Sequence, residues 1–431
     1  MLRSGLIPVL LAGALLVAVS ISINEYRALR HTSELDPISG LQQLQQSPLW
    51  AGHAGQALAQ RLDARWRLDP SQAQIHLHQQ LRHYPLDPWH WQLLARIDRE
   101  LGADAAHLQN RLNAASAIQP GHRELRWRAV NLSQHFGEAD LVAEQLKHWL
   151  EDQPGRTASA LFIAGRWIDE PDQQIARALP EGEAFLVAAM RHARSTRDTE
   201  LADAIWTRLP QPRQVNDPAV GDYARLLLSR GDHATASALL AQLDPYFERF
   251  GIPGGQFQFD MQGLSTLGWD FRAPQGSRVR IIDYTLPPIN MISTSGQSES
   301  IRALQLDFDG EHNLHFDRPV VRFPAPPPGH YQLQGWWRAQ GLTTRSLPSL
   351  QLRAQYSVLR EHINLPSRNF GWQRFTLDFE ITSAEDTLTL QVLRRSTQAF
   401  DRNLAGQLWL TDLRLQAIDP STTLTANGAE Q

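Results

Sequence analysis

Residues 329–340 read GHYQLQGWWRAQ, and apolar and polar side chains alternate along this stretch. One set comprises Tyr331, Leu333, Gly335, Trp337 and Ala339, and the other comprises Gln332, Gln334, Trp336, Arg338 and Gln340. Because side chains in a strand point alternately to opposite faces, this period of two predicts a half-buried antiparallel strand. The preceding residues 326–329, three prolines and a glycine, predict a turn from which the strand begins.

Trp336 falls on the polar face of this strand, among amides and a guanidinium. An indole can stack on the C–H face of a sugar, while glutamine and arginine bond its hydroxyls. The predicted glycan-binding residues are those expected to point outward on the sandwich: Gln334, Trp336, Arg338, Gln351, Arg353 and Gln355. Arginines on such a face favour an acidic glycan. The alternative is that Trp336 is covered by a loop or by the helical region.

Further strand-like stretches precede and follow this one, at 257–260, 268–271, 303–308, 350–356, 372–381, 387–393 and 407–415. Their order, with the Gly268-Trp269 turn and the closing Leu410-Thr411-Asp412-Leu413, resembles the carbohydrate-binding modules of the galactose-binding-like superfamily. The resemblance covers about residues 257–418 and implies an antiparallel β-sandwich of the jelly-roll type. Thr411 stands where such modules carry an acidic residue, which speaks against Asp412 as a ligand of a structural calcium.

Residues 47–249 are rich in Leu, Ala and Gln, and proline-containing breaks recur. Pro120 and Pro154 are 34 residues apart, which is the tetratricopeptide period. The unit from 223 to 245, with Gly231 in its turn, resembles such a repeat most closely. This resemblance implies stacked helix pairs whose groove binds a peptide or a partner protein.

The segment 6–23 is an apolar run of 18 residues without charge, and at 1.5 Å per residue a helix there spans about 27 Å. We therefore expect an uncleaved transmembrane anchor. The resemblance of residues 257–418 to sugar-binding modules implies that the bulk of the chain lies outside the cytoplasm. A signal peptide cut after the small residues Ala18-Val19-Ser20 is the rival interpretation.

The chain has 431 residues, a net charge of −4 and no cysteine. The charge argues against a nucleic-acid binder, and the lack of cysteine excludes disulfides and thiolate chemistry. The sequence predicts an anchor (1–23), a stalk (24–46), helical repeats (47–249), a hinge (250–256), a sandwich (257–418) and a disordered tail (419–431).

No nucleotide-binding, zinc-protease or serine-hydrolase motif is present, so no catalytic residue and no cofactor are predicted. His76 and His78 are two apart in a helical context and do not share a face. His312 and His315, beside Glu311, are three apart near a strand, hence on opposite faces. No metal site is predicted from these histidines.

The predicted fold class is multidomain, with a transmembrane helix, an all-α tetratricopeptide-like array and a C-terminal antiparallel β-sandwich. The whole resembles accessory proteins of bacterial exopolysaccharide synthesis and export. That resemblance implies a non-enzymatic inner-membrane protein with its bulk in the periplasm, which contacts polysaccharide and recruits protein partners. The alternatives are a purely structural scaffold without glycan binding and a glycan-modifying enzyme.

Overall fold

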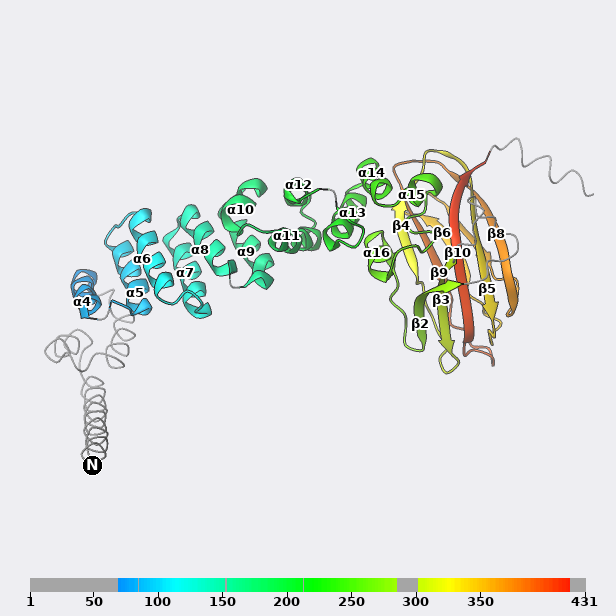
Figure 1. The fold of residues 1–431 in the computed structure, drawn as a ribbon, viewed down its shortest axis with the longest axis horizontal. Helices are drawn as coiled ribbons and strands as arrows, with labels where there is room; N and C mark the ends of the chain where they lie inside the picture. The colour runs from blue at the N-terminus through cyan, green and yellow to red at the C-terminus, as the bar shows by residue number, and fades with distance from the viewer. Residues whose placement is uncertain (1–68, 84, 152, 212, 285–300, 419–431) are drawn as a thin grey trace, which may run out of the picture. The chain divides into compact units, whose positions relative to one another are not determined.

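The structure is a computed structural model that describes residues 69–83, 85–151, 153–211, 213–284 and 301–418 (Figure 1). The chain divides into two compact units, Met1–Phe185 and Leu186–Gln431. We describe each by itself. The predicted stalk, residues 24–46, and the predicted tail, residues 419–431, lie outside the described residues.

The predicted fold class requires correction in its membrane-spanning element. The described residues form thirteen α-helices and two five-stranded antiparallel sheets. The longest of these helices have 14 residues, whereas a bilayer span needs about 20 apolar ones, and none of them meets that requirement. The predicted span, residues 6–23, lies outside the described part of the chain. The predicted localisation in the inner membrane depended on that span. It is corrected too, since no described helix could cross a membrane.

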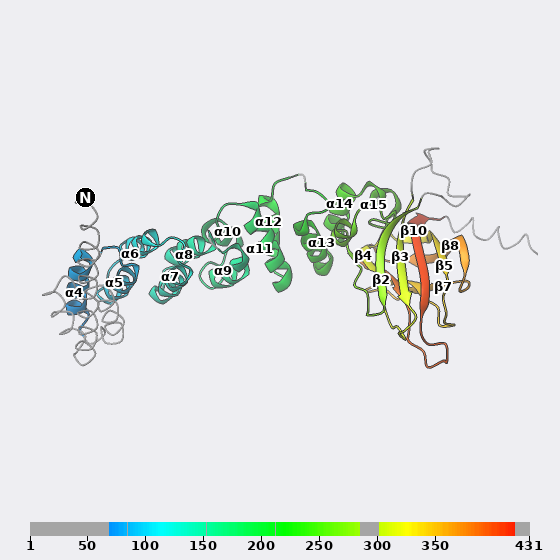
Figure 2. The same cartoon turned by 60° about the horizontal axis from the view of Figure 1, so that its bottom comes forward.

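The first unit consists of short helices that pack against their neighbours in sequence (Figures 1 and 2). They are α4 (Pro70–His83), α5 (Pro88–Glu100), α6 (Ala105–Ile118), α7 (Arg123–Phe136), α8 (Ala139–Glu151), α9 (Thr157–Ala164) and α10 (Pro171–Ala178), with a 3-10 turn at Pro154–Arg156. Ala95, Leu108, Leu112, Ala129 and Phe136 belong to a core shared by α5 to α8. Consecutive helices thus bury one another's apolar faces, as a repeat array requires.

The dipeptide Asp-Pro starts four of the described helices, the first being α4, where the Asp69 carboxylate accepts from the Gln72 amide at 3.0 Å. Asp87 caps α5, Asp217 caps α13 (Pro218–Arg230) and Asp244 caps α15 (Pro245–Phe250), each through its carboxylate. Proline suits the next position because its fixed φ is helical and its missing N–H has no partner there anyway. At the other end of α13, Gly231 has φ +83°, the left-handed conformation that ends many helices.

The second unit adds α11 (Glu183–Thr196), α12 (Thr199–Arg208), α14 (His233–Leu243) and α16 (Met261–Thr266) to α13 and α15. One sheet has the order β1-β4-β9-β6-β7 and the other β2-β3-β10-β5-β8. In the first sheet the strands are β1 (Trp269–Asp270), β4 (Val320–Pro324), β6 (Ser349–Ala354), β7 (Arg360–Asn364) and β9 (Thr387–Leu393). In the second they are β2 (Ser277–Tyr284), β3 (Ile301–Asp309), β5 (Gly329–Gln340), β8 (Phe370–Ile381) and β10 (Ala405–Ala417).

The two sheets enclose one apolar core, to which the helices also contribute. Leu240 of α14 and Phe247 of α15 are buried in it, and α14 packs on β4 while α15 packs on β10. The segment predicted as a hinge contains Gly255, whose carbonyl accepts from the Leu413 amide of β10 at 3.0 Å. A Cβ at position 255 would lie 2.3 Å from the Leu413 carbonyl oxygen, so only glycine permits this approach.

Candidate functional site

Strand β5 shows the predicted alternation. Leu333 and Trp337 point into the core, with 0% and 4% of their surfaces exposed, whereas Trp336 and Arg338 are half-buried on the outer face. Trp337 packs against Phe375 with ring centroids 4.7 Å apart. The in-and-out phase of this strand is therefore confirmed.

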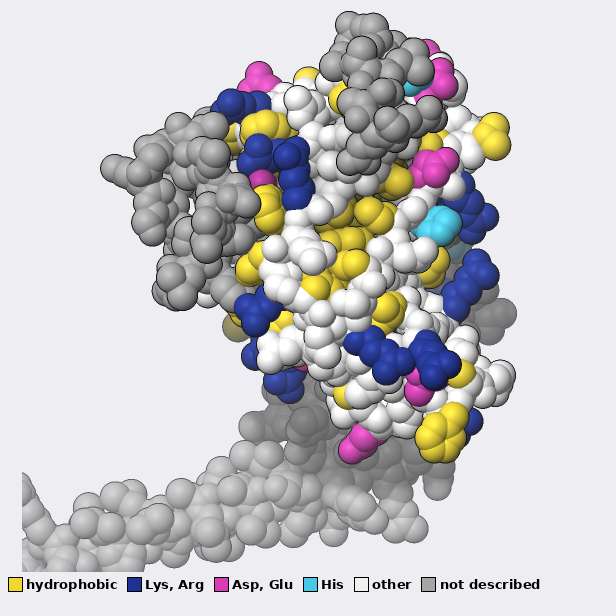
Figure 3. Space-filling view, turned by 90° about the vertical axis from the view of Figure 1, so that its right-hand side faces the viewer, with side chains coloured by type: hydrophobic (Ala, Val, Ile, Leu, Met, Phe, Trp, Pro, Cys, Tyr) yellow, Lys and Arg dark blue, Asp and Glu magenta, His cyan; other side chains and the backbone are white. Residues whose placement is uncertain are grey.

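The outer face around Trp336 is built from β5 and its two neighbours. In register, Trp336 lies opposite Thr411 of β10 and Arg374 of β8. The Arg338 guanidinium lies over the Trp409 ring, 4.9 Å from its centroid. Seen from the right-hand side of Figure 1, the molecular surface has apolar side chains over its middle, bordered by basic side chains (Figure 3). Trp336, Arg338 and Trp409 thus share the outer face of this sheet.

Gln334 is on the same face but is only 8% exposed. Its amide nitrogen donates to the Gln416 side chain at 2.6 Å, and its oxygen accepts from Arg374. The structure thus brings Gln334, Trp336 and Arg338 together, with the Gln334 amide already bonded within the sheet.

The other three predicted residues lie on the opposite sheet. Gln351 and Arg353 belong to β6, and Gln355 follows it. Gln351 is buried and accepts from the Gln391 amide at 2.9 Å, whereas Arg353 and Gln355 are exposed. Alternation tells which side chains point outward but not which sheet a strand joins, so the predicted set divides between two separate faces.

Arg353 and Gln355 line a cleft of about 1210 Å³ between the outer face of the β1-β4-β9-β6 part of their sheet and helices α13 and α16. Helix α16 packs on β1 and on α13. A Cβ on Gly221 of α13 would lie 3.0 Å from the Thr266 Cα of α16, so glycine allows the two helices to approach closely. We call this space the arginine cleft.

The lining of the arginine cleft is strongly basic, with seven arginines and a single carboxylate, Asp270. The arginines are Arg194, Arg197, Arg225, Arg272, Arg318, Arg322 and Arg353. The chain as a whole carries a net charge of −4, whereas the lining of this cleft is positively charged. A concentration of guanidiniums in a cleft attracts anions.

Four of these arginines are paired. Asp270 accepts from Arg272 at 2.6 Å and from Arg318 at 2.8 Å. The bond from Arg272 lowers the pKa of Asp270, with Arg318 adding to the effect. Asp222 of α13 pairs with Arg194 at 3.0 Å and with Arg225 at 3.5 Å.

The remaining three arginines have no such partner. Within the described residues, no carboxylate lies within ion-pair distance of Arg197, Arg322 or Arg353. Arg322 of β4 and Arg353 of β6 are both exposed, and each lies opposite Thr389 of β9 in register. They therefore point from the same sheet face with one strand between them.

An aromatic surface adjoins these cations. Phe271 lines the cleft and stacks on Trp269, with centroids 5.6 Å apart and planes 3° apart. Trp269 is buried, and its indole N–H donates to the Pro253 carbonyl at 2.8 Å. Because Trp269 is fixed in this way, it holds the Phe271 ring in place beside Asp270.

Sequence reasoning identified neither Arg322 nor Phe271 as a site residue. The signal was available for Arg322, since it alternates with the buried Val321 and Phe323 in the run VVRFP. What the sequence lacks is the pairing of β4 with β9 and the position of α16, which turn an outward arginine into part of a cleft.

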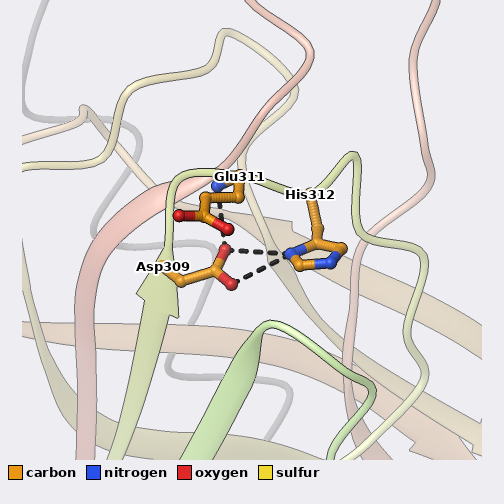
Figure 4. Close-up of side chains that lie close together, drawn as sticks. All are labelled: Asp309, Glu311 and His312. Carbon is orange, nitrogen blue, oxygen red and sulfur yellow. Dashed lines mark hydrogen bonds and ion pairs between the residues drawn. The ribbon is translucent and has the colours of Figure 1, made fainter.

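Asp309, Glu311 and His312 form a cluster at the end of β3, with ligand atoms within 4.8 Å of one another (Figure 4). The Asp309 carboxylate accepts from the Glu311 amide at 2.9 Å and lies 2.9 Å from His312 Nδ1. The bond from the Glu311 amide lowers the pKa of Asp309. This carboxylate holds a turn together. His315 is not part of the cluster.

Asp412, weighed as a calcium ligand in the sequence, accepts from the Tyr246 hydroxyl at 3.0 Å and from Arg414 Nε at 2.7 Å. Asp260 caps α16 by accepting from the Gly263 amide at 2.7 Å. Asp412 therefore connects α15 to β10, and Asp260 stabilises the first turn of α16.

No model of a known protein family matches the chain, and no curated protein matches it in sequence. Among solved structures, the active domain of bacteriophage CBA120 tailspike protein 4 matches 41% of this chain and 22% of its own, at 12% identity and TM-score 0.27. TmCBM61 in complex with β-1,4-galactotriose matches 33% of this chain and 90% of its own, at 11% identity and TM-score 0.20.

BtGH115A, a 4-O-methyl-α-glucuronidase with specificity for decorated arabinogalactans, matches 73% of this chain and 45% of its own, at 12% identity and TM-score 0.18. These structural neighbours are carbohydrate-binding and glycan-active proteins. At such TM-scores the likeness is too remote to assign a family or an activity. The tetratricopeptide assignment and the exopolysaccharide role therefore stay predictions.

Proposed function

We propose that this protein binds polysaccharide in the arginine cleft without modifying it, and that its helix pairs recruit protein partners. Such a protein would serve the assembly or export of an exopolysaccharide. The proposal keeps Arg353 and Gln355 from the residues predicted in the sequence and adds Arg322 and Phe271.

The observation that carries the proposal is the composition of the cleft. Guanidiniums donate paired hydrogen bonds to carboxylates and to adjacent hydroxyls. A fixed aromatic ring, here Phe271, offers an apolar surface to the C–H face of a sugar. Arg322 and Arg353 are exposed, and neither forms an ion pair with a carboxylate of the described residues that a ligand would have to break.

The same lining favours binding over turnover. Glycoside hydrolysis ordinarily uses two carboxyl groups, one of which donates a proton. The described lining contains one carboxylate, Asp270, and its bonds from Arg272 and Arg318 keep it ionised. An ionised carboxylate cannot donate a proton, so Asp270 is unsuited to act as the general acid.

The helix pairs of the first unit carry apolar side chains that suit contact with a protein. Phe162 of α9 is 68% exposed, and Trp127 of α7 is 39% exposed. Trp127 packs on the buried Trp149 with ring centroids 4.8 Å apart, so its position is fixed. Fixed exposed aromatic rings are common anchors in protein interfaces.

Affinity electrophoresis of the purified chain tests the glycan proposal, in gels cast with acidic or neutral polysaccharides. We expect retardation by an acidic polymer, lost in Arg353→Gln and kept in Trp336→Ala, which lies on the opposite sheet. If Trp336→Ala loses binding and Arg353→Gln keeps it, the glycan binds on the outer face of the sheet that contains β5. Retardation by no polymer would favour a purely structural scaffold.

A further inference from the structure

Arg322 and Arg353 occupy one row that crosses three adjacent strands. Thr389 of β9 is the register partner of both, so within the cleft the row reads Arg322, Thr389, Arg353, and it continues outside the lining with Arg360 of β7, the register partner of Arg353. Neighbouring strands lie about 4.8 Å apart, which separates the two arginine Cα atoms by about 9.6 Å. Thr389, which is uncharged, lies between them, so the sheet fixes the distance between the backbone positions of the two arginines.

The rows on either side of this one lack such cations. On one side, Val320 of β4 is followed by Gln391 and Gln351. On the other, Pro324 is opposite Thr387, whose hydroxyl lies 3.0 Å from His233 Nε2 of α14. On β4 and β6, the two arginines without a carboxylate partner among the described residues thus lie on one line across the strands.

The single carboxylate of the lining stands at one end of this arrangement. Asp270 of β1 pairs in register with Val320, so it is displaced from Arg322 both along and across the strands. Its charge is already matched by Arg272 and Arg318. It therefore leaves Arg322 and Arg353 available to a ligand.

We infer that the arginine cleft takes a linear polyanion whose acidic groups recur at about 10 Å, laid across β4, β9 and β6. This inference rests on the proposed function and specifies its ligand as an acidic polysaccharide, such as a polyuronate. Two like charges on strands that are separated by a third strand are each best neutralised by a separate carboxylate. A neutral chain would leave both guanidiniums without a counter-charge.

Calorimetric titration of the full chain tests this with a free uronic acid, uronic acid oligomers of increasing length and neutral oligomers of matched length. We expect a steep rise in affinity once an oligomer spans about 10 Å, because the second arginine then binds at high effective concentration. Arg322→Gln and Arg353→Gln should each lower the long-oligomer affinity by at least about tenfold and remove the length dependence.

A matched control is Arg338→Gln, the same change on the opposite sheet, which should leave the titration unchanged. The double variant should lose more affinity than either single one, since it also removes the single-site contact that each single variant keeps. A free uronic acid that binds as tightly as the long oligomer would overturn the inference. So would an equal loss in Arg338→Gln.

The outcomes also separate this inference from the proposed function. Equal binding of neutral and acidic oligomers, lost in Arg353→Gln, would leave glycan binding intact and refute the polyanion. Binding of no saccharide at all would refute both.

Discussion

Asp270→Asn changes the charge of the arginine cleft while keeping the shape of the side chain. It removes the one carboxylate of the described lining and breaks its ion pairs with Arg272 and Arg318, of which Arg318 keeps a second ion pair with Asp317. We expect the variant to bind an acidic polysaccharide more tightly than the wild type, because the already positive cleft loses one negative charge. Stability should fall by no more than about 1 kcal/mol, since Arg272 is largely exposed.

The magnitude follows from the register of the sheet. Asp270 is opposite Val320, one strand across and two residues along from Arg322. With a strand spacing of about 4.8 Å and a rise of about 3.4 Å per residue, the two positions lie about 8 Å apart. An acidic group bound at Arg322 is therefore repelled by Asp270 by about 0.5 kcal/mol in bulk water and about 2 kcal/mol at a protein surface. Affinity should rise between about twofold and thirtyfold.

Titration of wild type and variant with acidic and neutral polymers, at low and high salt, measures this gain. The gain should appear with the acidic polymer only and shrink as salt screens the charges. An unchanged or weaker affinity for the acidic polymer would refute the electrostatic account of the cleft. An equal gain for the neutral polymer would do the same.

Trp337→Ala should destabilise the protein by about 3–5 kcal/mol because Trp337 is buried, whereas Trp336→Ala should cost less than about 1 kcal/mol; equal losses in denaturant unfolding would contradict the phase of β5. Gly231→Val should cost about 1–2 kcal/mol because φ is +83°, and an unchanged thermal midpoint would refute this. Because the pKa of Asp270 is lowered in the folded protein, the contribution of its ion pairs to stability is complete above its unfolded pKa, about 3.9, and is lost as the pH falls from there through the lower folded-state pKa. Stability measured against pH should therefore fall less steeply on the acid side in Asp270→Asn than in the wild type, and parallel curves would contradict it.

Local features of the fold were readable from the sequence. The alternation in 329–340 predicted the strand β5 and the burial of Leu333 and Trp337. Gly231 was predicted to lie in a turn, and it does end α13 in the left-handed conformation. Each of these depends on a few neighbouring residues, which is why the sequence is sufficient.

The arrangement of strands was not readable in the same way. Arg353 and Trp336 both point outward, but β6 and β5 belong to different sheets, since β6 pairs with β9 and β5 with β10. Residues 257–260, expected to form a strand, instead lead into the cap of α16 at Asp260. Long-range pairing and the packing of α16 on β1 decide the site, and neither leaves a periodic signal in the sequence.

The most direct measurement is an arginine footprint of the wild-type chain, with an arginine-directed reagent and mass spectrometry, in the presence and absence of acidic polysaccharide. We predict that Arg322 and Arg353 lose reactivity when the polymer is present, because the polymer covers both exposed guanidiniums. Arg338 on the opposite sheet should react equally in both samples. Protection of Arg338, with Arg322 and Arg353 unchanged, would contradict the assignment of glycan binding to the arginine cleft.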